Sequence, residues 1–259
     1  MKLIKRWLKL PGTRHIKDLD DPAATLFHAR TVQCKPFLRR LYIDFYRQLK
    51  KAAPDSKGRV VVELGSGGGF IKEVIEDAVT SDILELPNVD KTFSALDMPF
   101  GEGSVDAFLM IDVLHHITDS KGFFIEALRC LKVGGKIVMI EPANTLWARF
   151  IYSNFHHELF DTQADWTLQA GGPLSTANGA LPWIIFSRDR EIFEQEFPSL
   201  RITAMRNHTP FRYLLSGGLS YRQLVPSFTY QLVKAAEFAL SPVNNWLGMF
   251  QTIVLEKVA

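Results

Sequence analysis

Two pairs of adjacent histidines are the side chains of this sequence best suited to proton transfer. They are His115-His116 and His156-His157. An imidazole titrates near neutral pH, so it can take a proton from a reacting hydroxyl group. We therefore consider His116 and His157 as candidate catalytic bases. The alternative interpretations are a scaffold role for the first pair and plain loop structure for the second.

The second histidine pair also has a superficial likeness to a metal-binding cluster, because Glu158 and Asp161 follow it closely. Adjacent side chains of an extended segment point to opposite faces, however, and the pair has no His-x-x-x-His pattern or cysteine partner. We therefore expect no metal site.

A glycine-rich turn follows a short β-branched run, since residues 61–70 read Val-Val-Glu-Leu-Gly-Ser-Gly-Gly-Gly-Phe. Bare backbone at the carboxyl end of a strand lets a ligand approach closely. A dinucleotide fingerprint needs its third glycine at position 70, where this chain has Phe70. The turn therefore favours another adenosine ligand, and a nicotinamide-dependent oxidoreductase is the weaker interpretation.

This turn resembles the first motif of the class I S-adenosylmethionine-dependent methyltransferases. The resemblance is to the small-molecule branch similar to the ubiquinone and menaquinone methyltransferases (methyltransferase type 11 domain). Their acidic-x-Gly-x-Gly-x-Gly motif is met by Glu63, Gly65, Gly67 and Gly69. Three further segments match the family in order, at residues 98–107, 112–117 and 128–135, so the resemblance covers about residues 59–142.

The resemblance implies that the chain binds S-adenosylmethionine and transfers its methyl group. The cofactor-binding residues that it implies are Glu63, Gly65, Ser66, Gly67, Asp82, Ser94, Ala95 and Asp112. Asp82 holds the position at which the family binds the ribose hydroxyls. Ser94 departs from the family, which commonly has an acidic residue for the adenine amino group there, so we expect Ala95 to contribute through its backbone.

Strands and helices that alternate along the chain must position these residues. Helical patterns cover residues 22–33, 36–51, 70–77, 120–131 and 227–240. Short strands are expected at 59–64, 78–81, 92–95, 105–111, 136–140, 201–205 and 250–255. Such alternation implies right-handed crossovers. We therefore predict an α/β fold with a doubly wound, Rossmann-like seven-stranded sheet that closes with an antiparallel pair at one edge.

Four regions follow from this pattern. Residues 1–57 form an N-terminal basic helical arm and cover, 58–143 the S-adenosylmethionine-binding core, 144–198 an inserted lid, and 199–259 the completion of the sheet with further helices. The helices at 22–51 are expected to cover the cofactor, with Tyr42 or Tyr46 near its methionine carboxylate. The lid is loop-like in composition and rich in aromatic residues, which favours an apolar acceptor, although such residues are also ordinary core.

Composition and charge bound the environment of the protein. The chain has 259 residues, of which 47% are hydrophobic and 22% charged, as in ordinary globular proteins. Its two cysteines, Cys34 and Cys130, read as reduced thiols, which indicates the cytoplasm. Residues 1–51 hold 13 Lys or Arg against four Asp. A peripheral membrane contact through residues 1–14 is one interpretation of this basic arm, and packing on the acidic body is the other.

These observations predict methyl transfer to an oxygen, with carbon as the second choice, of a small or lipid-linked and partly apolar acceptor. We expect no nucleic-acid partner, because the segment after residue 111 is not Asn/Asp-Pro-Pro-aromatic and no basic surface is interleaved with aromatic residues. A non-catalytic protein that binds S-adenosylmethionine is the alternative outside enzymes.

Overall fold

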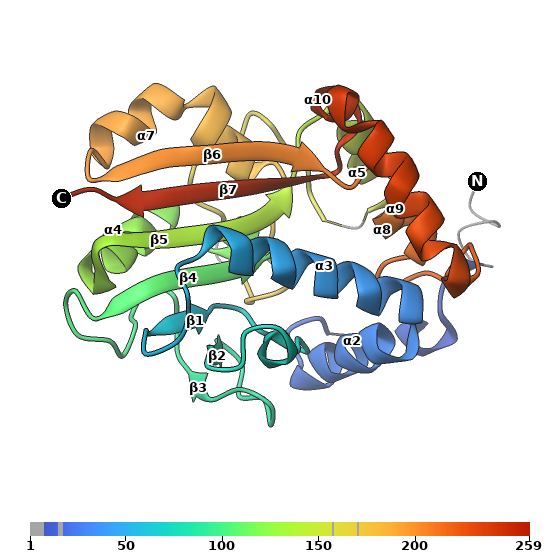
Figure 1. The fold of residues 1–259 in the computed structure, drawn as a ribbon, viewed down its shortest axis with the longest axis horizontal. Coiled ribbons are helices and arrows are strands. Elements are labelled where there is room, and N and C mark those ends of the chain that lie inside the picture. The colour runs from blue at the N-terminus through green and yellow to red at the C-terminus, as the bar shows by residue number, and fades with distance from the viewer. Residues whose placement is uncertain (1–7, 15–17, 157, 170) are drawn as a thin grey trace.

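A computed structural model describes residues 8–14, 18–156, 158–169 and 171–259 of the chain. Seven strands form one sheet in the order β3-β2-β1-β4-β5-β7-β6 (Figure 1). The strands are β1 (Val61–Glu63), β2 (Val79–Asp82), β3 (Lys91–Thr92), β4 (Val105–Ile111), β5 (Leu131–Pro142), β6 (Leu200–His208) and β7 (Phe250–Lys257). The neighbouring strands β3, β2, β1, β4 and β5 pair in parallel in that order. Strand β7 runs antiparallel to both β5 and β6. The predicted α/β sheet and its antiparallel edge are confirmed.

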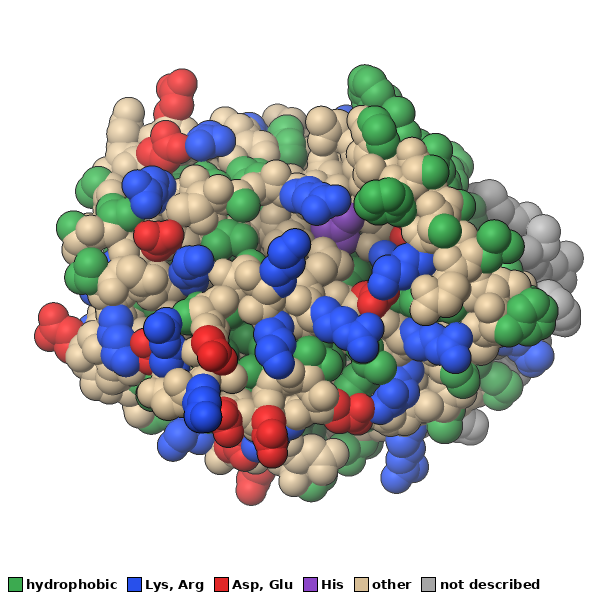
Figure 2. Space-filling view, in the orientation of Figure 1, with side chains coloured by type: hydrophobic (Ala, Val, Ile, Leu, Met, Phe, Trp, Pro, Cys, Tyr) green, Lys and Arg blue, Asp and Glu red, His purple; other side chains and the backbone are tan. Residues whose placement is uncertain are grey.

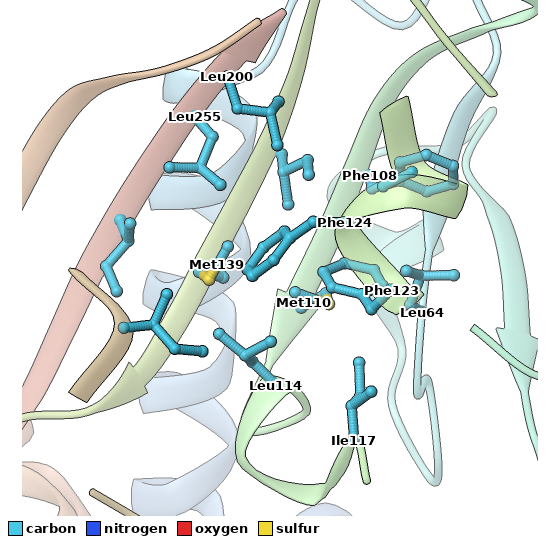
Figure 3. Packing of buried hydrophobic residues seen from close by; sticks show 14 of the residues in the cluster. Leu64, Phe108, Met110, Leu114, Ile117, Phe123, Phe124, Met139, Leu200 and Leu255 are labelled. Carbon is cyan, nitrogen blue, oxygen red and sulfur yellow. The ribbon is translucent and has the colours of Figure 1, made fainter. Parts of the chain in front are cut away.

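Helices cover both faces of the sheet, so the central strands are apolar on both sides. Along β5, Val138 belongs to the core that contains α3 (Pro36–Ala52), whereas Met139 belongs to the opposite core with α4 (Ser120–Cys130). Figure 3 shows the second core, where Phe124 of α4 lies against Met139. Successive strand residues point to opposite faces, which explains this division.

Seven further helices complete the described fold. They are α2 (Pro22–Cys34), α5 (Leu146–Phe155), α6 (Leu181–Trp183), α7 (Arg190–Glu196), α8 (Arg212–Ser216), α9 (Tyr230–Ala239) and α10 (Asn244–Leu247). Of these, α6 and α7 pack with α4 in the second core. The side chains of Asp21, Asp119 and Thr145 accept hydrogen bonds from backbone N–H groups in the first turns of α2, α4 and α5. These caps fix where each of the three helices begins.

The structure corrects two local predictions. The helix expected at residues 70–77 is reduced to a 3-10 turn, Ile71–Glu73. Three residues of this segment, Ile71, Val74 and Ile75, are β-branched and have low helix propensity. The region 144–198, which is loop-like in composition, contains α5, α6 and α7, with Thr145 as the N-cap of α5.

The N-terminal arm is described only from Leu8 onward, so residues 1–7 of the predicted membrane contact lie outside the described residues. The Leu10 N–H donates to the Ser220 carbonyl at 3.0 Å, and the Arg222 N–H donates to the Leu8 carbonyl at 2.8 Å. This part of the arm therefore pairs with the segment that follows α8. In the described part of the chain, no helix has both the length and the apolar character that a membrane span requires.

Candidate active site

A cavity of about 1300 Å³ lies at the carboxyl ends of β1, β4 and β5. Its wall is formed by the glycine-rich loop after β1, by α2 and α3, by residues 151–179 of the predicted lid, and by the segment around α8. Ligands of doubly wound α/β proteins bind at this edge of the sheet. The cavity is therefore the place where we look for chemistry.

The glycine-rich loop adopts a backbone path that side chains would prevent. Gly65 and Gly67 have φ angles of +63° and +51°, in the left-handed region that glycine tolerates. A Cβ atom on Gly68 would lie 2.1 Å from the Cβ of Ala29, so α2 packs directly on the loop. Backbone thus forms this part of the cavity wall, and α2 closes one side of it.

Glu63 ends β1 and lines the cavity with one carboxylate oxygen unpaired. The side chain is buried, and its Oε2 atom has no hydrogen-bond partner among the residues that the structure describes. Burial raises the pKa of Glu63 to about 8, although the Ser66 and Tyr46 hydroxyls lower it. A cationic group beside this oxygen would supply the missing hydrogen bond and favour the ionised carboxylate. The position therefore suits a ligand's ammonium group.

Two tyrosines of α3, Tyr42 and Tyr46, line the same cavity. Burial raises the pKa of each phenol above its ordinary value, so both hydroxyls keep their protons at neutral pH. The Tyr46 hydroxyl also accepts the Phe70 N–H at 3.2 Å, which fixes its position beside the loop. The single Tyr46 proton is directed at Glu63, so Tyr42 is the tyrosine that can donate a hydrogen bond to a ligand's carboxylate.

A cluster of histidines and glutamates forms another part of the wall. His115 Nδ1 lies 2.7 Å from Glu141 Oε2, and His115 Nε2 lies 3.5 Å from Glu158 Oε2. Glu141 Oε1 accepts the N–H groups of Val113 and Leu114 at 2.9 and 2.8 Å, which fixes its orientation. Burial lowers the pKa of His115, but the two carboxylates raise it well above the ordinary value. His115 is therefore a buried cation held between two anions.

The neighbouring His116 has the opposite protonation state. Its Nδ1 atom lies 3.1 Å from the Thr176 carbonyl oxygen, so this nitrogen donates, and its Nε2 atom lies 3.8 Å from Glu158 Oε1. Burial and the adjacent His115 cation lower the pKa of His116 to about 4. At neutral pH the imidazole is therefore uncharged, with the lone pair of Nε2 available to accept a proton.

Asp112 follows β4 and also lines the cavity. Its φ angle of +57° is unusual for a residue other than glycine. Burial raises the pKa of Asp112 to about 8, whereas the His115 cation lowers it. A cation placed nearby would favour the ionised form of this carboxyl group.

Two sets of side chains bring potential metal-ligand atoms within 4.8 Å of one another: His115, His116 and Glu158, and Asp112, His115 and Glu141. His115 belongs to both sets, and its two nitrogens face carboxylates that favour the protonated ring. A protonated imidazole has no lone pair to give to a metal ion. In the described part of the chain, hydrogen bonds and ion pairs join His115 to Glu141 and to Glu158.

The structure brings together some of the residues predicted from the sequence and leaves others apart. The cavity wall contains Glu63, Gly65, Ser66, Gly67, Asp112 and His116. It does not contain Asp82, Ser94 or Ala95. His157 lies outside the described residues.

Asp82 instead supports the glycine-rich loop. Its buried carboxylate accepts the Gly67 N–H at 2.8 Å and the Leu84 N–H at 2.9 Å. Ser94 accepts the Leu96 N–H through its hydroxyl at 3.1 Å, and Ala95 packs against the apolar core.

Sequence reasoning missed Glu141 and considered Glu158 only as part of a metal cluster. Both reach His115 from distant parts of the chain, so no local spacing reveals them. The signal that was present is the position of Glu141 near the end of the predicted strand at 136–140, which parallels Glu63 at the end of the first strand.

Residues 62–139 match a family model described as a methyltransferase domain. A demethylmenaquinone methyltransferase of Tropheryma whipplei (strain Twist) is 42% identical over 45 residues, which cover 17% of this chain and 19% of that protein. The chain thus matches about a fifth of the length of this curated relative.

Two solved structures show the same fold at low sequence identity. A possible histamine N-methyltransferase from Thermotoga maritima, named as S-adenosylmethionine-dependent, has a TM-score of 0.54 at 15% identity and covers 83% of this chain and 89% of its own. A complex of the Haloferax volcanii Trm112 methyltransferase activator with a putative methyltransferase has a TM-score of 0.50 at 13% identity, with 90% and 97% covered.

The methyltransferase domain that the motifs predict is therefore confirmed over residues 62–139, and the fold agrees with that of the solved structures.

Proposed function

We propose that this protein transfers the methyl group of S-adenosylmethionine to a hydroxyl oxygen of a partly apolar acceptor, either small or lipid-linked. One observation carries the proposal. A single cavity joins the glycine-rich loop and the unpaired Glu63 oxygen to a neutral His116 beside Glu158. A donor site and a proton acceptor are thus combined in one enclosed space.

The donor end of the cavity fits the methionine part of the cofactor. Glu63 would receive the ammonium group, and Tyr42 would donate a hydrogen bond to the carboxylate. The backbone of Gly65 and Gly67 would lie along the ligand. When bound, S-adenosylmethionine supplies a methyl group that is already a strong electrophile, so the protein has to align the acceptor and remove its proton.

Asp82 is proposed as a positioning residue, because its carboxylate holds the Gly67 N–H. A ribose contact of Asp82 and adenine contacts of Ser94 and Ala95 stay predictions of the family resemblance, since these residues are absent from the cavity wall.

His116 is proposed as the catalytic base. As the bond from the acceptor oxygen to the methyl carbon forms and the carbon–sulfur bond breaks, the hydroxyl proton passes to His116 Nε2. Glu158 Oε1, 3.8 Å from that nitrogen, stabilises the resulting imidazolium. His115 acts as a positioning residue, because its cation attracts Glu158 on one side and Glu141 on the other.

Apolar side chains favour an acceptor that is itself partly apolar. The lid and the segment after α8 contribute Ile151, Phe155, Leu159, Phe160 and Leu219 to the wall. Pockets of this kind hold a ligand by apolar contact and orient it by a few polar groups. His116 and Glu158 are polar groups of the same wall. A neutral histidine beside a carboxylate suits an acceptor that has a hydroxyl at its reacting end.

The test is transfer of a labelled methyl group from S-adenosylmethionine to phenols, quinols and hydroxylated lipids. We expect label in a hydroxylated acceptor, with transfer lost in His116→Gln while cofactor affinity is kept. Label found only on carbon or nitrogen would contradict the hydroxyl assignment. Cofactor binding without transfer to any of these acceptors would favour the non-catalytic alternative.

A further inference from the structure

An apolar groove of about 500 Å³ lies between α5, α8 and α9. Trp147 of α5 forms one wall, and Leu232 and Val233 of α9 form another. Leu214 and Leu224 line both this groove and the active-site cavity. The groove therefore shares a wall with the site at which the acceptor is methylated under the proposed function.

Large apolar side chains beside the groove face the solvent. Phe150 is 53% exposed, Leu224 52% and Leu232 73%. Phe150 stacks on Trp147 with 6.0 Å between ring centroids, and it contacts Phe155 of the cavity wall at 6.1 Å. We call Phe150, Phe155, Leu224 and Leu232 the apolar rim. Figure 2 shows hydrophobic side chains gathered at the end of the molecule formed by α9 and α10.

The segments that build this end almost lack acidic residues. The chain has 28 Asp and Glu residues in total, yet residues 142–157 contain none. Residues 197–255 contain only Glu237, which is buried and paired with Arg212. A solvent-exposed carboxylate is therefore missing from these two segments.

Cations accompany the apolar rim. Arg149 on α5 and Arg222 after α8 are exposed. Lys9 of the N-terminal arm is exposed as well, and it forms a β-bridge with Tyr221, next to Arg222. An apolar patch that has cations at its border, and whose two main segments lack exposed carboxylates, matches a bilayer whose acyl chains lie beneath anionic headgroups.

We propose that the apolar rim docks on an anionic lipid bilayer. Large exposed apolar patches on a protein mark sites of association. The charge pattern around this one favours an anionic lipid surface over a protein surface of mixed charge. The docking does not depend on methyl transfer. That the groove carries the apolar part of an acceptor from the bilayer to the cavity rests on the proposed function.

The test is co-sedimentation of the full chain with vesicles of phosphatidylcholine, with and without about 30% phosphatidylglycerol. We expect binding to the anionic vesicles that weakens as salt is raised. The double variant Phe150→Ser/Leu232→Ser should bind at least roughly tenfold more weakly, because two apolar side chains no longer enter the bilayer.

A matched control is Ile125→Ser/Val133→Ser, whose side chains are 64% and 69% exposed on α4 and near the start of β5, away from the cavity. This control should bind like the unaltered chain, and circular dichroism verifies that both variants fold. Glu63→Gln should also keep vesicle binding, so failure of the docking and failure of the methyl-transfer proposal are distinguishable.

Equal vesicle binding by Phe150→Ser/Leu232→Ser and the unaltered chain would overturn the proposal, as would absence of binding by the unaltered chain. If sedimentation without lipid instead reveals a dimer that these two substitutions dissociate, a second copy of the chain covers the rim and the proposal is wrong.

Discussion

Two buried charged clusters of this molecule differ in what their charges face. In the first, Arg212 of α8 donates to Asp44 of α3 at 2.8 Å and to the Tyr230 hydroxyl at 2.7 Å, and it pairs with Glu237 of α9. In the second, the histidine–glutamate cluster lines the cavity. The first cluster joins three helices and meets only other protein groups, whereas the second leaves the lone pair of His116 open to a ligand.

The surroundings of a buried charged group therefore indicate whether it serves structure or function. Buried ions of a structural network are matched by partners that satisfy them, so their removal acts on folding. A group whose pKa is shifted and whose reactive atom faces a cavity is suited to chemistry, so its removal acts on turnover. Variants of each cluster should therefore affect different measurements.

The largest effect is expected for Arg212→Met. Asp44 and Glu237 would stay buried without their main cation, so the free energy of unfolding should fall by about 3–5 kcal/mol in denaturant titration. Lys234→Met is the control, because this half-exposed lysine also lies 2.8 Å from Asp44 and should cost less than about 1 kcal/mol. Equal losses of unfolding free energy in the two variants would show that the burial of the cation does not determine its contribution to stability.

His116→Gln should lower the turnover number by about 10²–10⁴, the usual contribution of a general base, with the free energy of unfolding nearly unchanged. His208→Gln is the control, since His208 is buried outside the cavity wall and bonds to Thr252. The control should reduce stability and leave the turnover of the folded protein intact. Full turnover in His116→Gln would show that His116 is not the catalytic base.

The pH dependence of turnover should show a smaller but diagnostic effect. The pKa of His116 in the folded protein is lowered to about 4, so the base stays unprotonated as pH falls from 7 to about 5 and is half lost only near pH 4. A histidine with its ordinary pKa would already lose roughly tenfold at pH 5.5. A decline centred near pH 6.5 would contradict the protonation state assigned to His116.

Much of the fold could be predicted from the sequence because its signals are local. The β-branched run before the glycine-rich turn predicted β1, and the apolar run at 105–111 predicted β4 with the same bounds. The expected helix at 70–77 failed because apolar periodicity does not include helix propensity, which is low for the β-branched Ile71, Val74 and Ile75. Helix α5 was missed because aromatic residues in its sequence resemble those of a loop-like lid.

The candidate site was predicted less completely, because its chemistry depends on long-range contacts. The glycine-rich loop and Glu63 are adjacent in sequence, so a motif revealed them together. The protonation states of His115 and His116 depend on Glu141 and Glu158, which approach from another strand and from the lid. A sequence shows that a histidine pair exists, but not which member of it is charged.

The most direct test of the account is calorimetric titration with S-adenosylmethionine, S-adenosylhomocysteine and NAD, each in two buffers of different ionisation enthalpy. At pH 7 the Glu63 carboxyl group, with a pKa of about 8, is mostly protonated before binding.

We expect both sulfur ligands to bind and NAD not to bind. Protons should be released, and close to one of them should come from Glu63, because the ligand's ammonium group favours the Glu63 carboxylate. Glu63→Gln should abolish the Glu63 part of this release and weaken binding roughly ten- to hundredfold. Binding of NAD alone, or unchanged affinity and proton release in Glu63→Gln, would contradict the account.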